Sequence, residues 1–274
     1  MVSMDMVMQG GALCVLLLGV LVLPRAPYPR AELLSLVGLS AAGGLITGRL
    51  LWWVVANQRR PSGVDVHVLW SFSEGGIGSV GVLVGAMCSA LCVMALLDMR
   101  KRKEIADFLA PLGMFALGMA RLGCMFHGCD FGVELEPQSY LTSFTWLSHL
   151  GGRYFPGSAP AWSWFSLTGG LLPDSGTPWL WPFAFVLGVG NVLISIVFFV
   201  LFYRRTLPVG WVALGVGCVY SAWRLVLEGW RHDAAGALVS GVNVNQALMA
   251  CALVVWCGVG VFWPVMARRK KADV

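Results

Sequence analysis

Long apolar stretches constrain the fold of this chain more than any other feature of its sequence. The 274 residues are 58% hydrophobic and only 12% charged. The apolar residues gather in stretches of about 20, the length that a helix needs to cross a bilayer. We expect seven spans, at about 6–23, 33–56, 76–97, 107–127, 179–203, 208–229 and 245–266. Because backbone polar groups in lipid must be satisfied within the segment, these spans predict an all-α polytopic membrane protein, with a single membrane domain over 1–274.

Lysines and arginines between the spans predict the orientation of the chain. The basic residues at 25 and 30, 100–103, 204–205 and 268–271 fall on one side if the N-terminus is outside and the C-terminus inside. Only those at 59–60 fall on the other side, so the positive-inside rule favours an N-out, C-in protein. The net charge of +5 comes largely from basic residues at span ends, and we therefore expect no nucleic-acid partner.

The stretch 130–178 is the longest part of the chain without a span. It contains prolines, a pair of adjacent glycines and three tryptophans, Trp146, Trp162 and Trp164. We expect a small head insertion of irregular or short helical structure on the outer side. Its tryptophans are expected at the level of the lipid headgroups.

Three arginines lie inside predicted spans, where an ionisable side chain is expensive. Arg49, Arg121 and Arg224 each fall about 16 residues, or roughly 24 Å of helix, from the inner end of their span. Charged residues at such depth mark a functional site by default, and arginine binds phosphate through paired hydrogen bonds. The sequence therefore predicts a site for an anionic group in the outer half of the bilayer. The alternative is a structural ion pair or a side chain that snorkels outward.

Polar and glycine-rich motifs surround two of these arginines. Glu228 lies four residues after Arg224 on the same helix face. The two residues either belong to the anion site or form a structural ion pair that only neutralises both charges. Glycines recur at 118, 123, 128 and 132 around Arg121. Glycines leave room for a close approach of backbone or ligand, so this stretch is expected to pack tightly or to line the site.

The third span begins with a motif of its own. Glu74 stands at its outer mouth, and Gly81 and Gly85 follow with the spacing of a small-xxx-small face. Such a face is typical of closely packed membrane helices, and we expect it to contact another helix.

Together, in this order, the motifs resemble those of the prolipoprotein diacylglyceryl transferase family over residues 40–266. The matching elements are Gly48-Arg49-Leu50, the glycines from 75–76 to 85, the Asp-Phe-Leu-Ala-Pro run at 107–111, Arg121-Leu122-Gly123 with the polar stretch to Gly132, and the late set Tyr220, Arg224, Glu228 and Arg231. The resemblance also includes seven spans and an outer N-terminus.

The resemblance implies a reaction and its location. Such enzymes move the diacylglyceryl group of phosphatidylglycerol, or a related anionic phospholipid, to the thiol of the lipobox cysteine in a lipoprotein precursor. A thioether forms, glycerol phosphate leaves, and no cofactor is expected. The location is the bacterial cytoplasmic (inner) membrane. Carried over to this chain, Arg121 and Arg224 are catalytic candidates. The expected substrate-binding residues are Arg49, Glu74, Tyr220, Glu228 and Arg231.

Several family positions hold other residues in this chain. Val80 stands where the family has a histidine. Cys124, His127 and Cys129 stand in place of its Asn, Asn and Glu, and Thr-Pro-Trp-Leu at 177–180 replaces His-Pro-Ser-Gln. His127 is therefore our third catalytic candidate, as the base that deprotonates the thiol. Alternatively, Cys124 or Cys129 acts as a nucleophile toward another acceptor.

Two other kinds of protein fit parts of the pattern. The first is a non-catalytic protein of the same fold that binds anionic phospholipid. It fits the arginines together with the replacement of the family histidine by Val80. A thiol or metal protein fits Cys124, His127 and Cys129, but their spacing is not that of a zinc site, and we predict no metal.

Overall fold

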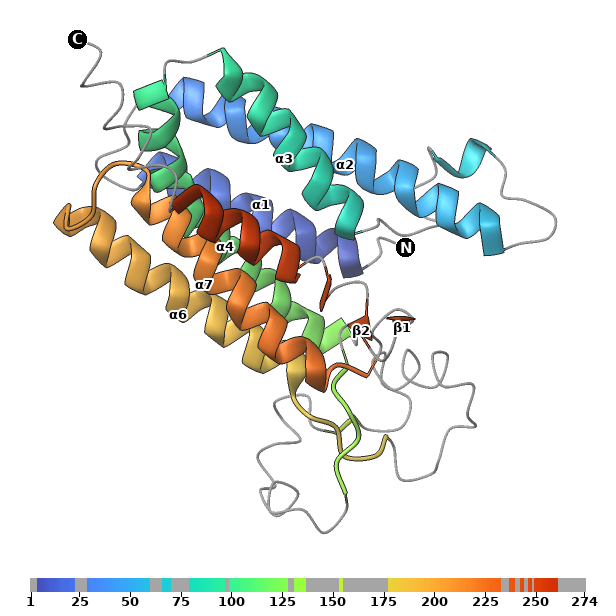
Figure 1. Cartoon of the computed structure of the whole chain (residues 1–274). Coiled ribbons are helices and arrows are strands. Elements are labelled where there is room, and N and C mark those ends of the chain that lie inside the picture. The colour runs from blue at the N-terminus through green and yellow to red at the C-terminus, as the bar shows by residue number, and fades with distance from the viewer. Residues whose placement is uncertain are drawn as a thin grey trace. The chain divides into compact units, whose positions relative to one another are not determined.

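The computed structural model of the chain describes residues 4–22, 29–59, 66–69, 79–96, 99–127, 131–136, 153–154, 177–232, 237–239, 242–243, 246–247 and 249–260. Its helices are α1 (Met4–Val22), α2 (Arg30–Arg59), η1 (Val66–Leu69), α3 (Ser79–Ala95), α4 (Met99–His127), α6 (Phe183–Arg204), α7 (Trp211–Leu227) and η4 (Glu228–Trp230), followed by a helix at Met249–Gly260 (Figure 1). Each of the seven apolar stretches of the sequence therefore contains a helix.

The fold is helical, as predicted. Four helices are long and apolar enough to cross a membrane, at Arg30–Val54, Lys101–Met125, Phe183–Arg204 and Trp211–Trp230, and two shorter apolar segments lie at Val84–Ala95 and Met249–Gly260. The number of seven crossings and the N-out orientation stay predictions. Short strands also occur: β1 (Ala237–Val239) pairs antiparallel with β2 (Val242–Asn243), a detail that the all-α prediction did not include.

The chain divides into two compact units, 1–108 and 109–274, with the boundary inside α4. Each unit is described by itself. The single domain over 1–274 and the head insertion at 130–178 stay predictions, and most of the insertion falls outside the described residues.

In the first unit, α2 and α3 pack through their glycines. A Cβ atom on Gly81 would lie 2.7 Å from both the Gly48 Cα and the Thr47 carbonyl oxygen, and one on Gly44 would lie 2.9 Å from the Val82 carbonyl oxygen. Gly85 makes an equally close approach to α2. Only glycine permits backbones to come this near, so the small-xxx-small face of the third span packs against a helix, as predicted.

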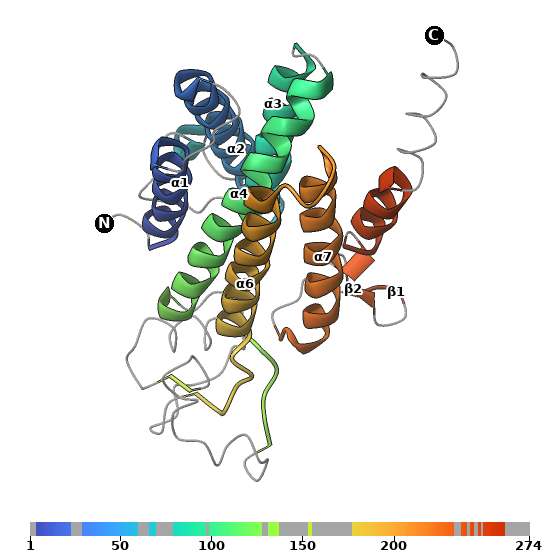
Figure 2. The ribbon, with the colours of Figure 1, turned by 90° about the vertical axis from the view of Figure 1, so that its left-hand side faces the viewer.

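In the second unit, α4, α6, α7 and the helix at 249–260 lie side by side (Figure 2). Three glycines make these contacts close. Gly118 of α4 meets Val192 of α6, Gly190 of α6 meets the indole of Trp223 in α7, and Gly217 of α7 meets the indole of Trp256. Side chains from α4, α6 and α7 complete the core: Met114, Phe198, Val212 and Val216.

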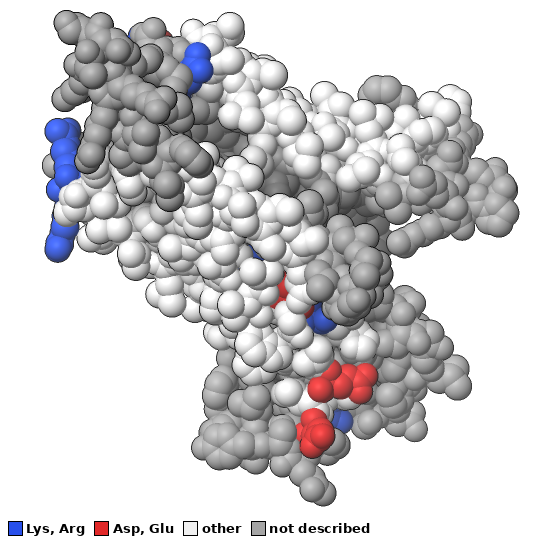
Figure 3. Space-filling model, viewed as in Figure 1, with Lys and Arg blue, Asp and Glu red and all other residues white. Residues whose placement is uncertain are grey.

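The outer face of α6 is apolar. The side chains of Leu193, Ile196, Val197 and Val200 are exposed on it, and the surface along the helices is largely free of charge in Figure 3. An exposed apolar stripe on a helix with a hydropathy of 2.6 is what contact with lipid requires. The described face of α6 is therefore suited to the membrane interior.

Candidate functional site

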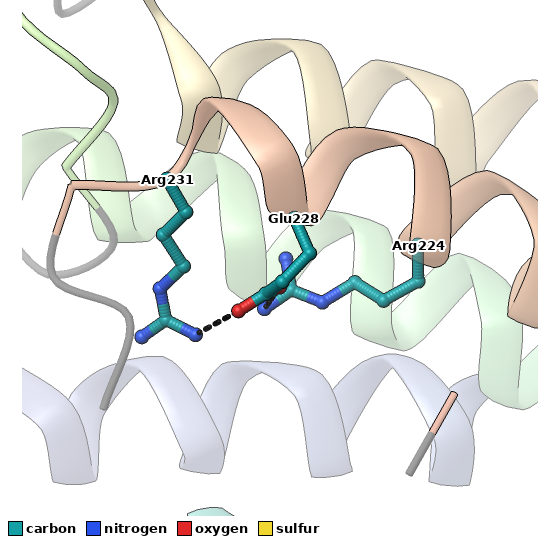
Figure 4. A network of polar contacts seen from close by, with 3 residues as sticks. All are labelled: Arg224, Glu228 and Arg231. Atoms are coloured by element: carbon teal, nitrogen blue, oxygen red, sulfur yellow. Dashed lines mark hydrogen bonds and ion pairs between the residues drawn. The ribbon is translucent and has the colours of Figure 1, made fainter. Parts of the chain in front are cut away.

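A network of three charged residues lies at the end of α7 (Figure 4). Nη2 of Arg224 lies 2.9 Å from Oε2 of Glu228. Nη1 of Arg231 donates a hydrogen bond of 3.3 Å to the other carboxylate oxygen, Oε1. The Glu228 side chain is fully buried, while 7% of the Arg224 side chain and 16% of the Arg231 side chain are exposed. One buried carboxylate therefore holds two guanidinium groups.

The local backbone explains how both arginines reach the same carboxylate. Arg224 and Glu228 are one α-helical turn apart and share a face. After Leu227 the chain tightens into the 3-10 turn η4, and Arg231 then leaves in an extended conformation with φ −93° and ψ 126°. Arg231 follows Glu228 by three residues, a spacing that keeps both side chains on one side of the axis in a 3-10 turn as in an α-helix.

An aromatic ring supports the arginine that lies deeper in the chain's core. The Arg224 Cζ atom lies 5.1 Å from the centre of the Phe183 ring. Phe183 begins α6 and packs in a buried cluster with Leu187 of the same helix and Leu227 of α7. The ring covers one face of the guanidinium, so the donors of Arg224 point along its edges.

Three extended segments fix the end of the network. The segment 131–135 lies between 177–181 and 230–232: the amide of Val133 donates to the Trp230 carbonyl at 2.9 Å, and its carbonyl accepts from the Trp181 amide at 2.9 Å. Gly132 bridges Arg231 in the same ladder. A Cβ atom on Gly132 would lie 2.8 Å from the Trp181 Cβ, so this position needs glycine. The close approach predicted for the last glycine of the motif is thus present.

The network joins two guanidinium groups to one carboxylate. Arginine stays protonated at any relevant pH, so both guanidinium groups keep their positive charge. Guanidinium groups donate paired hydrogen bonds to phosphate and carboxylate oxygens. The arrangement therefore suits an anionic group, and Arg231 is its most exposed member.

The other described candidates of the second unit lie on α4 and α7. Arg121 is half-buried on α4, between Gly118 and Leu122, which both contact α6. Tyr220 is half-buried on α7, one turn before Arg224, and packs against the hydrophobic core. Whether Arg121 and Arg224 act on one ligand stays a prediction.

In the first unit, Arg49 is bound to its own surroundings. It is only 4% exposed, and its Nε donates a 3.1 Å hydrogen bond to the Leu69 carbonyl of η1. Its Cζ lies 4.6 Å from the centre of the Trp52 ring, one turn along α2. These contacts anchor η1 on α2, so the structural alternative for a membrane arginine has direct support at this position.

Four candidate positions are not described. Glu74 and Cys129 lie outside the described residues, and the side chains of Val80 and His127 are not described although both residues lie in helices. Cys124 is half-buried on α4. The hypotheses of a histidine base, of a cysteine nucleophile and of a thiol or metal centre are therefore not tested by the geometry.

Sequence reasoning missed two buried residues of the second unit. Phe183 gave no signal, because one more aromatic residue in an apolar span is ordinary. Asn191 did give one, since it is an amide in the middle of the apolar helix α6, and it is 0% exposed.

Comparison with known proteins agrees with the motifs. The family model described as prolipoprotein diacylglyceryl transferase matches residues 6–264. A protein of Proteus mirabilis is 29% identical over 266 residues, which covers 91% of this chain and 81% of the relative. One of Erwinia tasmaniensis is 28% identical over 260 residues, with 90% and 81% covered. Both bear the name phosphatidylglycerol–prolipoprotein diacylglyceryl transferase.

Proposed function

Because the chain belongs to the prolipoprotein diacylglyceryl transferase family, we propose that it is a membrane transferase of lipoprotein biosynthesis. Its donor is phosphatidylglycerol or a related anionic phospholipid. Its acceptor is the lipobox cysteine of a lipoprotein precursor. The observation that carries the proposal is the buried network in which Glu228 holds the guanidinium groups of Arg224 and Arg231, in a chain that matches the family over nearly its whole length.

The chemistry of the network suits the donor. A phosphodiester headgroup carries one negative charge, and guanidinium groups bind phosphate oxygens through paired hydrogen bonds. During transfer the acceptor sulfur forms a bond to the glyceryl carbon while the bond from that carbon to the phosphate oxygen breaks. The thiol proton leaves with the departing glycerol phosphate or through a base. Negative charge grows on the departing phosphate, and guanidinium groups fixed beforehand stabilise that charge.

The remaining roles belong to the same proposal. Arg121 and Arg224 bind the departing phosphate, Glu228 orients Arg224 and Arg231, and Tyr220, Arg49 and Glu74 contribute to substrate binding. His127 accepts the thiol proton, because Val80 does not offer a titratable group. The enzyme is a seven-span protein of the cytoplasmic membrane with its N-terminus outside, so that the site faces the outer leaflet.

Transfer in a defined membrane tests this function. The purified protein is placed in phosphatidylglycerol vesicles with a lipobox peptide, and the peptide is weighed by mass spectrometry. We expect a diacylglyceryl mass gain that is lost with Arg224→Gln and with Arg121→Ala. Arg205→Gln is the matched control, because Arg205 is an exposed arginine beyond the end of α6.

The outcomes separate the alternatives. No mass gain with wild-type protein in phosphatidylglycerol would refute the transferase, and retained phosphatidylglycerol in that case would indicate a lipid-binding protein. Full activity of His127→Ala would remove His127 from the mechanism and leave the network's role intact.

A further inference from the structure

Asn191 is a buried polar residue in the middle of α6 that the proposed reaction does not use. Its side chain is fully enclosed, and neither Oδ1 nor Nδ2 has a hydrogen-bond partner among the residues that the structure describes. A primary amide without partners is costly in any protein core, and more so in a helix that crosses a membrane. A polar partner of Asn191 is therefore to be expected.

The surroundings of Asn191 are set by contacts between α6 and α4. One turn before it, Gly188 lies against Leu122. One turn after it, the Ser195 hydroxyl donates a 2.7 Å hydrogen bond to the Pro111 carbonyl. Gly188, Asn191 and Ser195 all belong to the buried face of α6. The amide thus lies on the face of α6 that meets α4, between the contacts of Gly188 and Ser195. Lipid tails have no access to this buried face.

Other polar atoms are available around this position. Nε1 of Trp223 is buried and has no partner within the described part of the chain, and its indole lies against Gly190, the residue next to Asn191. The Ser195 oxygen uses its proton toward Pro111 but keeps acceptor capacity. Pro111, whose carbonyl accepts from Ser195, lies inside α4.

We propose that Asn191 binds an internal water molecule between α4 and α6. The occupant must both donate and accept hydrogen bonds, must be small enough for an enclosed position, and must carry no charge, because Asn191 is neutral. Water meets all three conditions, and internal water commonly satisfies buried polar groups that have no protein partner. This site is independent of the transferase proposal, because it needs neither phosphatidylglycerol nor a precursor peptide.

Radiolytic hydroxyl labelling of the full-length protein in vesicles tests the site. Radicals formed from a bound water oxidise the nearest side chains before they diffuse away, even where bulk solvent has no access. Trp223 is the probe, because its buried indole lies against Gly190, the residue next to Asn191. We expect its oxidation rate to fall several-fold in Asn191→Leu. Ser195→Ala is the matched control, because it removes the neighbouring hydroxyl on the same face and leaves the amide, so most of the labelling is retained.

Thermal unfolding of the same variants provides the second measurement. Leucine has nearly the shape of asparagine, so Asn191→Leu removes the amide without a cavity. If the amide truly lacked a partner, the variant would unfold at a higher temperature than the wild type, and the proposal would be overturned. Unchanged Trp223 oxidation in Asn191→Leu would overturn it as well. A midpoint at or below the wild-type value together with reduced labelling supports the water site.

Discussion

Removing the carboxylate of Glu228 is the sharpest test of how the charged network is held together. Its side chain is fully buried and lies 2.9 Å from Arg224 and 3.3 Å from Arg231. Breaking a buried ion pair by removing one partner costs about 3–5 kcal/mol, because the charge left behind has no counter-ion. We expect Glu228→Ala to destabilise the protein by about that amount. Glu228→Gln keeps an acceptor oxygen and is expected to cost about 1–3 kcal/mol.

The magnitude is large relative to what a folded protein can lose. Native stabilities are about 5–15 kcal/mol, so the alanine variant removes a substantial share. Chemical unfolding in a fixed detergent gives the difference. Glu136→Gln is the control: it is also a glutamate of the second unit, but it is exposed, and a surface change of this kind stays within about 0.5 kcal/mol.

Lipid dependence distinguishes the network from an ordinary ion pair. Without the carboxylate, the local charge around the two guanidinium groups is more positive by one. Phosphatidylglycerol should therefore restore more stability to Glu228→Gln than to the wild type, while a zwitterionic lipid should not. A Glu228→Gln variant within about 0.5 kcal/mol of the wild type in detergent would refute the reasoning, because a buried counter-ion cannot be lost without cost.

Three further changes test the surroundings of the site and the packing of each unit. Phe183→Leu removes the ring over the Arg224 guanidinium, a contact worth about 0.5–2 kcal/mol, so the rate of diacylglyceryl transfer should fall, and Phe183→Tyr should restore it. Equal rates for the wild type and both variants would exclude a role of this contact in transfer. Gly81→Val forces α3 away from α2 and should lower stability in thermal unfolding by about 1–3 kcal/mol, whereas Gly38→Val on the open face of α2 should have a small effect; similar losses at both positions would contradict the packing. Gly132→Ala places a methyl group against Trp181 and should increase hydrogen exchange in the ladder, while Gly229→Ala, which meets nothing within 4 Å, serves as the control; protected amides in both variants would count against it.

The helices could be predicted from the sequence because the membrane leaves few choices. An apolar stretch in lipid must satisfy its backbone within itself, so length and hydropathy suffice to place a helix. The pair of Arg224 and Glu228 was predictable for the same reason, since a spacing of four defines a shared face once the helix is known. The spacing of Gly81 and Gly85 likewise predicts a close helix contact, and these residues pack against α2.

The extended segment that begins at Arg231 could not be predicted in this way. The spacing of three from Glu228 predicts a shared face while the helix continues, but the chain leaves the helix at Arg231. The backbone there is held by pairing to 131–135, a segment about a hundred residues earlier. Pairing between such distant, short segments has no local sequence signal.

Arg49 shows why depth in a span is weaker evidence than pairing. Arg49 and Arg224 share a predicted depth, yet the contacts described above differ in kind. Arg49 is held by a backbone carbonyl and an indole. Arg224 has a carboxylate partner that it shares with a second arginine. A shared carboxylate fixes the direction of two guanidinium groups at once, and fixed donors are what stabilisation of a departing phosphate requires. The network at the end of α7, more than the arginines taken singly, is therefore the part of this chain that connects its fold to the chemistry of its family.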